Sequence, residues 1–222
     1  MNRKQKYDLL EKLTCKNNDT LSEAEKDAVS ELASSREIFF RSMAARALAD
    51  IGGEFVTDLL ILLSSDKNSL VRTEAVDSLG YHPSEKVLEL LINKAQNDPY
   101  YLVRAYSVSS AYRVSASLGI SSDRVRSLAE QLLKKERYVI CKVFCLEAMY
   151  LCGDDAALAK MITLFDAAAY NGKCAVLNVL TDILNEDNKD IIESFASGVE
   201  KTTLAPSVIE SFDNLTDALY AM

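Results

Sequence analysis

Apolar residues recur along the chain at the spacing of amphipathic helices. Across residues 69–81 they follow a 3.6-residue period at Leu70, Val71, Ala75, Val76 and Leu79. Pro83 disfavours continuing this helix, because proline lacks an N–H and restricts the residue before it. Ser84 can then cap a second helix. The apolar face of that helix is Val87, Leu88, Leu91, Ile92 and Ala95. The pattern therefore predicts two helices between residues 69 and 97.

Helix pairs of this kind repeat along the chain. Each copy begins with a basic residue, followed after two positions by two small or apolar residues and after two more by an apolar one. The copies begin at Arg41, Arg72, Arg104, Lys142 and Lys173, with a fainter one at Ala205. Their spacings are 31, 32, 38, 31 and 32 residues, which is typical of a repeat architecture. The longest spacing predicts an insertion near residues 115–122 that lengthens one connection.

Neither helix of a unit can bury its apolar stripe alone, whereas stacked units form a continuous core. We therefore predict an all-α fold, a right-handed α-solenoid of about five helical hairpins with terminal capping helices. We expect one domain over residues 1–222, with 1–33 as the N-terminal cap, 34–199 as the repeats and 200–222 as a C-terminal half repeat or cap. Ser22 and Glu25 have the spacing of a capping box at the second helix of the N-terminal cap.

The repeat resembles a known family. Residues 66–80, Asp-Lys-Asn-Ser-Leu-Val-Arg-Thr-Glu-Ala-Val-Asp-Ser-Leu-Gly, look like the HEAT-repeat signature, in particular the short HEAT-like repeats first named for phycobilisome lyases. Residues 98–104 match it again, and the resemblance covers residues 34–215. It implies a fold rather than a function, because this class includes adaptors, inhibitors, chaperones, lyases and a DNA glycosylase group.

The resemblance also implies a structural role for the basic residue of the repeat. In three units an acidic residue stands six positions earlier: Asp66 before Arg72, Asp98 before Arg104, and Glu136 before Lys142. In HEAT-like families such residues form a ladder of hydrogen bonds between adjacent units. Ala167 takes the acidic position before Lys173, so we expect packing there to depend more on apolar contacts.

The net charge is unevenly distributed along the chain. Its 222 residues carry 25 basic and 33 acidic side chains, a formal net charge of −8, which argues against a general nucleic-acid binder. Residues 146–222 hold 4 basic and 13 acidic residues, whereas residues 1–145 are nearly neutral. A local excess of basic residues lies within 113–142. We expect the acidic C-terminal third to steer a basic partner.

Targeting signals and cysteines indicate a compartment. The longest apolar run, Leu59–Leu63, is far shorter than the ~20 residues of a membrane span, and no apolar stretch of a signal peptide follows the basic N-terminus. The five cysteines are an odd number in mostly apolar contexts. Such cysteines are typical of reduced thiols, so we expect a cytoplasmic protein that does not bind membranes.

The residues that usually carry chemistry are sparse. The single histidine, His82, precedes a proline, and we expect a surface or turn histidine. Cys141, Cys145 and Cys152 fall on one predicted helix, with Cys174 in the next unit, but a structural zinc site needs four ligands brought together, usually from turns. Cys145 occupies the small buried position of the repeat. The sequence therefore predicts no catalytic residue, no cofactor and no metal.

Two acidic turns need no functional explanation. Asp154-Asp155 and Asp187-Asn188 lie between predicted helices, and helix capping accounts for them. The same acidic side chains remain candidates for an interaction surface, because caps are exposed.

These observations favour a non-enzymatic protein-binding module, expected to be a monomer. We expect its inner, concave face to come from the second helix of each unit, and tyrosines to act as anchors. The candidate partner-binding residues are Glu54, Asp58, Glu85, Glu89, Asn93, Tyr100, Tyr101, Arg126, Glu130, Asp154, Asp155, Asp187 and Glu193. Charge and size suit a bacterial immunity protein that neutralises a basic toxin.

Two enzymatic alternatives stay open. A HEAT-like DNA glycosylase needs a basic groove and aromatic residues, which only residues 113–142 support in this chain without tryptophan. The second alternative is a phycobilin lyase-like protein, although nothing in the sequence identifies a bilin site.

Overall fold

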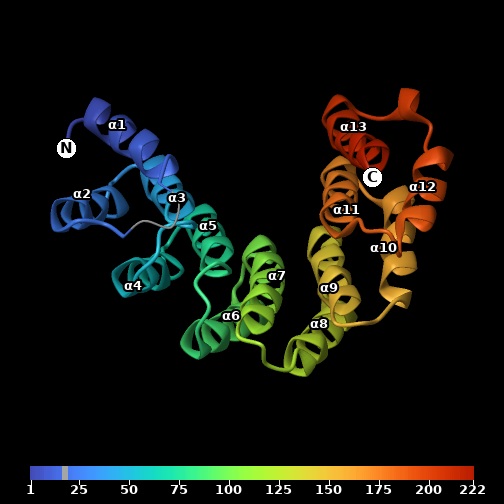
Figure 1. The fold of residues 1–222 in the computed structure, drawn as a ribbon, viewed down its shortest axis with the longest axis horizontal. Helices are drawn as coiled ribbons and strands as arrows, with labels where there is room; N and C mark the ends of the chain where they lie inside the picture. Colours follow the sequence, from blue (N-terminus) through green and yellow to red (C-terminus); the bar gives the residue numbers. More distant parts are fainter. Residues whose placement is uncertain (17–19) are drawn as a thin grey trace. The chain divides into compact units, whose positions relative to one another are not determined.

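The computed structural model describes residues 1–16 and 20–222 (Figure 1). Within these residues the chain forms thirteen α-helices, one short 3-10 helix and no strand. This confirms the predicted all-α fold. The chain divides into two compact units, unit 1 over Met1–Val125 and unit 2 over Arg126–Met222. One continuous right-handed solenoid over residues 1–222 stays a prediction, as does the number of repeats.

Unit 1 contains seven helices and the start of an eighth among its described residues. They are α1 (Arg3–Thr14), α2 (Glu23–Ala33), α3 (Ile38–Ala47), α4 (Glu54–Leu63), α5 (Ser69–Leu79), α6 (Glu85–Asn97) and α7 (Tyr101–Ser117). Helix α8 (Asp123–Lys135) begins in unit 1 and ends in unit 2.

The helices of unit 1 lie in two layers. Helices α1, α3, α5 and α7 pack one after another in a row, and α2, α4 and α6 pack against that row (Figure 1). Packing along α3, α5 and α7 is more extensive than between successive helices of the other layer. Because the helices of this row lie closer together than those of the other layer, unit 1 curves with α3, α5 and α7 on its inner side. The expectation that the second helices supply the inner face is therefore wrong for unit 1.

Helix starts follow the capping residues of the sequence at several places. Ser22 and Glu25 form the predicted capping box of α2, and the Ser84 hydroxyl accepts the Val87 N–H at 3.2 Å at the start of α6. The expectation that helix capping accounts for the turns at Asp154-Asp155 and Asp187-Asn188 is wrong. Asp155 and Asn188 occupy the N-cap positions of α10 and α12, yet neither makes a side-chain cap hydrogen bond.

The predicted insertion lies in a helix rather than in a connection. Helix α7 has 17 residues, whereas the equivalent helix α5 has 11. The connection from α7 to α8 spans only residues 118–122. Helix α7 buries side chains around most of its surface, including several serines. A longer helix of this kind therefore leaves no apolar face exposed to water, and the extra residues stay helical.

Arg72 takes part in the hydrogen-bond ladder that the resemblance implies, and Arg41, which was not part of that expectation, has the equivalent contacts. The Arg41 guanidinium donates to the Asp66 carboxylate at 2.7 and 2.9 Å, and Arg72 donates to Asp98 at 2.9 and 2.8 Å. Each arginine also donates to the carbonyl six residues before it, Ser35 or Asp66. Each guanidinium thus links the turn before its own helix to the aspartate that precedes the first helix of the next helix pair.

Unit 2 has the same two-layer plan. Its further helices are α9 (Val139–Leu151), α10 (Ala156–Ala167), α11 (Tyr170–Ile183), α12 (Lys189–Gly198) and α13 (Pro206–Ala221), with the 3-10 helix η1 at Lys201–Thr203. Helices α9, α11 and α13 pack in a row, with α10 against α9 and α11, and α12 against α13. The arginine of the ladder is replaced by Lys173, whose ammonium lies 4.5 Å from the centroid of the Phe165 ring.

Candidate functional site

A cavity of about 470 Å³ opens where the α3–α4 turn of unit 1 lies beside the α5–α6 turn. We call it the turn cavity. Its lining residues are Gly52, Gly53, Glu54, Thr57, Asp58, Tyr81, His82, Pro83, Ser84 and Lys86. It brings together two of the predicted partner-binding residues, Glu54 and Asp58, with a tyrosine and a histidine that were not among them.

His82 forms part of the wall of the turn cavity and holds the two turns together. Only 8% of its surface is exposed, so the expected turn position is confirmed and the expected surface exposure is wrong. The ring Nε2 lies 3.1 Å from the Leu48 carbonyl, to which it can only donate, and Nδ1 lies 3.2 Å from the Thr57 hydroxyl. In the neutral ring Nδ1 is then the acceptor. Burial lowers the pKa of His82, although the hydrogen bond to Leu48 partly opposes this shift. Both ring nitrogens are engaged, so the neutral ring is a structural link.

The acidic side of the turn cavity comes from the first turns of α4. Glu54 and Asp58 are exposed and four residues apart, hence on one face of the helix. The Lys86 ammonium pairs with the Asp58 carboxylate at 2.8 Å. Gly53 precedes the helix with a φ of +114°, a conformation that favours glycine. Two carboxylates and one ammonium leave the cavity with a net negative charge.

A smaller cavity of about 190 Å³ lies on the row of α3, α5 and α7. We call it the row cavity, and Arg46, Thr73, Glu74, Asp77 and Tyr106 line it. Burial raises the pKa of Glu74, with Arg46 opposing the shift. The negative charge of the two carboxylates in the row cavity is partly neutralised. Asp77 pairs with Arg113 at 2.5 Å, and the Arg46 guanidinium lines the same cavity.

Residues 25–111 match a family model described as HEAT repeats. This segment of the chain consists of HEAT repeats. The predicted family is therefore confirmed over α3 to α6 and the adjoining parts of α2 and α7. HEAT repeats generally mediate protein–protein interactions. A search of curated proteins found no match for the sequence. The family thus supplies a fold and a general role, while any more specific function has to come from the surface of this chain.

The other predicted partner-binding residues of unit 1 line neither the turn cavity nor the row cavity. Glu85 and Asn93 are exposed on α6. Glu89 accepts two hydrogen bonds from Arg124, at 2.6 and 3.0 Å, and the Arg124 guanidinium lowers its pKa. Tyr100 and Tyr101 are half-buried, and their ring centroids lie 5.1 Å apart.

The basic stretch of residues 113–142 is partly neutralised by its own ion pairs. Arg113 pairs with Asp77 and Arg124 with Glu89. Arg126, a predicted partner-binding residue, donates to Glu130 at 3.2 Å one helical turn later. These carboxylates occupy the guanidinium groups that a phosphate backbone would need, so the support for a nucleic-acid groove is weakened.

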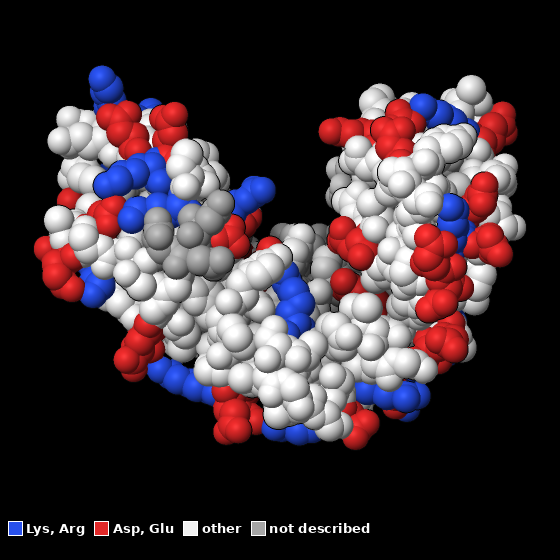
Figure 2. Space-filling view, in the orientation of Figure 1, with Lys and Arg blue, Asp and Glu red and all other residues white. Residues whose placement is uncertain are grey.

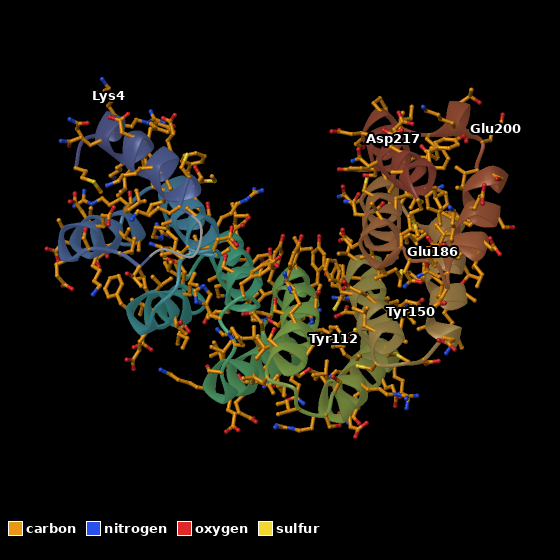
Figure 3. All side chains as sticks on the ribbon, in the orientation of Figure 1. Lys4, Tyr112, Tyr150, Glu186, Glu200 and Asp217 are labelled. Carbon is orange, nitrogen blue, oxygen red and sulfur yellow. The ribbon has the colours of Figure 1, made fainter. Side chains whose placement is uncertain are left out.

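Unit 2 presents an acidic surface, seen in Figure 2 over the helices coloured yellow to red in Figure 1. Of the 13 acidic residues in 146–222, all but Glu147 are at least partly exposed. Three of them are labelled in Figure 3: Glu186 lies in the α11–α12 connection, Glu200 lies between α12 and η1, and Asp217 lies on α13. The predicted residues of this unit belong to the same surface: Asp154, Asp155, Asp187 and Glu193.

The five cysteines are free thiols. Cys145 is buried, as predicted for the small position of the repeat. Cys141 is buried too, and Cys15 is exposed. A hydrogen bond with the neighbouring Cys145, together with burial, raises the pKa of the Cys141 thiol, which keeps it protonated and unreactive. Among the described residues no three His, Cys, Asp or Glu side chains are grouped so that they could hold a metal ion.

Sequence reasoning missed most of the cavity residues. Glu74 and Asp77 stand two and five positions after Arg72, and Tyr106 stands two positions after Arg104. Aligning the repeats by their basic residue would have placed these side chains on one face of the first helix. Tyr81 and His82 gave no comparable signal, because their contact with the α3–α4 turn joins segments about thirty residues apart.

Proposed function

We propose that this chain is a non-enzymatic module that binds a basic partner protein. The observation that carries the proposal is the acidic surface of residues 146–222, where 12 of the 13 acidic residues are at least partly exposed and only 4 basic residues stand against them. A surface of one sign attracts a partner of the other, which raises the rate of encounter and disfavours like-charged competitors. The general role of HEAT repeats in protein binding supports the same conclusion.

The absence of catalysis is part of the proposal. His82 is buried and hydrogen-bonded through both ring nitrogens, and the Cys141 thiol is held in its neutral form. These are the residue types that most often act as base or nucleophile near neutral pH. Neither is available for that task in this fold.

A bacterial immunity protein is the narrower form of the proposal. Such a protein binds one cognate toxin in the cytoplasm and blocks it by covering a basic surface. The size and acidic balance of this chain support it. Co-expression with a toxin-like protein encoded beside its gene would test it: restored growth supports the narrower form, and unrelieved toxicity contradicts it.

The broader proposal is tested by capturing partners with the purified chain and measuring their affinity. We expect the captured protein to be basic. Reversing Glu186, Asp187 and Asp190 to lysine should weaken binding at least tenfold, because three favourable long-range interactions become repulsive. The matched control reverses Asp8, Glu11 and Asp27, which are equally exposed in unit 1 and change the net charge by the same amount. Equal losses in both variants, or no basic partner at all, would contradict the proposal.

Among the described residues, no helix is long and apolar enough to cross a membrane. We place the protein in the cytoplasm as part of the proposal, which five free cysteines support. A monomeric state stays a prediction.

A further inference from the structure

We propose that the turn cavity binds an arginine side chain of the basic partner. The inference rests on the proposed function, because it names the chemical group by which that partner is anchored in unit 1. It starts from the chemistry of the cavity wall. Tyr81, Pro83 and the glycine backbone at 52–53 provide apolar surface, and Glu54 and Asp58 provide carboxylates.

An arginine side chain needs both kinds of wall. Its three methylene groups are apolar, whereas its guanidinium requires hydrogen-bond acceptors when it leaves water. Asp58 already pairs with the Lys86 ammonium. Glu54 also attracts the Lys86 ammonium, whose pKa it helps to raise, but that ammonium makes its hydrogen bond to Asp58. The exposed Glu54 carboxylate can therefore make a bidentate contact with an incoming guanidinium.

Tyr81 supports arginine over other cations. The Arg113 guanidinium lies 4.6 Å from the centroid of the Tyr81 ring, which shows that this ring already serves as a platform for a planar cation. The side chain is still 54% exposed, so ring surface remains for a second one. A planar guanidinium can stack on the ring and reach Glu54 edge-on, while an ammonium group makes point contacts only.

The cavity is open because two glycines line it. A Cβ atom at Gly52 or Gly53 would meet no atom within 4 Å, so the backbone leaves unfilled space there. Gly53 needs its positive φ, but Gly52 does not. A larger side chain at position 52 is therefore tolerated by the fold and reduces the space for a ligand.

The test measures binding of the blocked tripeptide Gly-Arg-Gly by amide chemical shifts of the ¹⁵N-labelled full chain. We expect saturable shifts at the amides of Gly52, Gly53 and Tyr81. The same peptide with citrulline, which is uncharged, should bind about tenfold more weakly or not at all, as should the Glu54→Gln and Gly52→Leu variants with the arginine peptide. Glu23→Gln is the matched control, because Glu23 is an exposed carboxylate in the first turn of α2 that does not line the cavity.

Three results would overturn the inference: no saturable shift at these amides, equal binding of the citrulline peptide, or equal binding of a Gly-Lys-Gly peptide. The outcomes are separable from the fate of the proposed function. If a basic partner is captured and Glu54→Gln leaves its affinity unchanged, the function stands and the anchor fails. If the arginine peptide binds but no basic partner exists, the guanidinium site stands and the function fails.

Discussion

Single arginines carry structural charge in this protein. The Arg72 and Asp98 side chains are only 12% and 4% exposed, yet each finds an opposite charge and well-aligned hydrogen bonds. Arg72 also donates to the carbonyls of Asp66 and Lys67. Buried charges are tolerated only when they are satisfied in this way. The ladder therefore makes the spacing between successive helix pairs of unit 1 specific.

Removing one partner of the ladder should destabilise the fold strongly. We expect Arg72→Ala to lower the free energy of unfolding by about 3–5 kcal/mol, because Asp98 is left buried and unpaired. Urea denaturation followed by circular dichroism measures it. Arg124→Ala removes an ion pair of similar geometry at the surface and serves as control, with no measurable change expected. Equal effects would contradict a structural role for the ladder.

His82 should make stability depend on pH. Burial lowers its pKa from an ordinary value of 6.5, so the unfolded chain takes up a proton before the folded protein does. The stabilising effect is complete above pH 6.5 and is lost as the pH falls toward the lowered pKa of the folded state. We expect the melting temperature to decrease between pH 7 and 5.5.

The matched variant for this effect is His82→Gln, which removes the only histidine of the chain. It should be less stable at pH 7 and show a smaller decrease toward pH 5.5. Glu74 acts in the opposite direction, because burial raises its pKa, and its contribution is common to both proteins. Parallel curves for the two proteins would show that His82 does not carry the pH dependence.

At the scale of elements, helix rows pack closely enough to require small residues. Gly172 on α11 lies against Val139 at the start of α9 and Ala168 at the end of α10, where an added Cβ would come within 3.0 Å of a Val139 methyl group and 2.9 Å of the Ala168 Cβ. Neither neighbour is the end of a flexible side chain. The close approach of α9 and α11 therefore depends on the glycine.

Gly172→Ala should destabilise the protein although alanine is the better helix former. We expect a loss of about 1–3 kcal/mol from overpacking, measured by urea denaturation. Gly198→Ala in α12 is the control within the same unit, because nothing lies within 4 Å of its added Cβ. There we expect a neutral or stabilising change of up to about 1 kcal/mol. Stabilisation by both substitutions would show that α11 can move away from α9.

At the scale of the whole molecule, charge distribution matters more than net charge. The chain carries −8, and residues 146–222 alone carry an excess of nine acidic residues. We expect association with a basic partner to slow at least tenfold between 50 and 500 mM NaCl, since salt screens long-range attraction. Dissociation should change much less. Stopped-flow or surface-binding kinetics would show it, and an association rate that is independent of salt would contradict steering.

The sequence alone determined the repeat, the helices and the charge distribution. Periodicity of 3.6 residues, caps such as Ser84 and the recurring Arg72 position depend on neighbours along the chain, and counting charges needs no coordinates. The ladder was implied in kind by the resemblance to HEAT-like repeats. Its partners were not: the carboxylate that holds Arg72 belongs to Asp98, 26 residues later.

Only the tertiary structure decided which side chains share a site. The turn cavity joins Glu54 and Tyr81 from different helix pairs, and burial of His82 depends on the carbonyl of Leu48. The inner row of unit 1 and the extended α7 likewise follow from packing between helices. Such contacts depend on how one helix pair rotates against the next, a quantity that amphipathic periodicity leaves undetermined because it specifies a buried face but not the partner of that face.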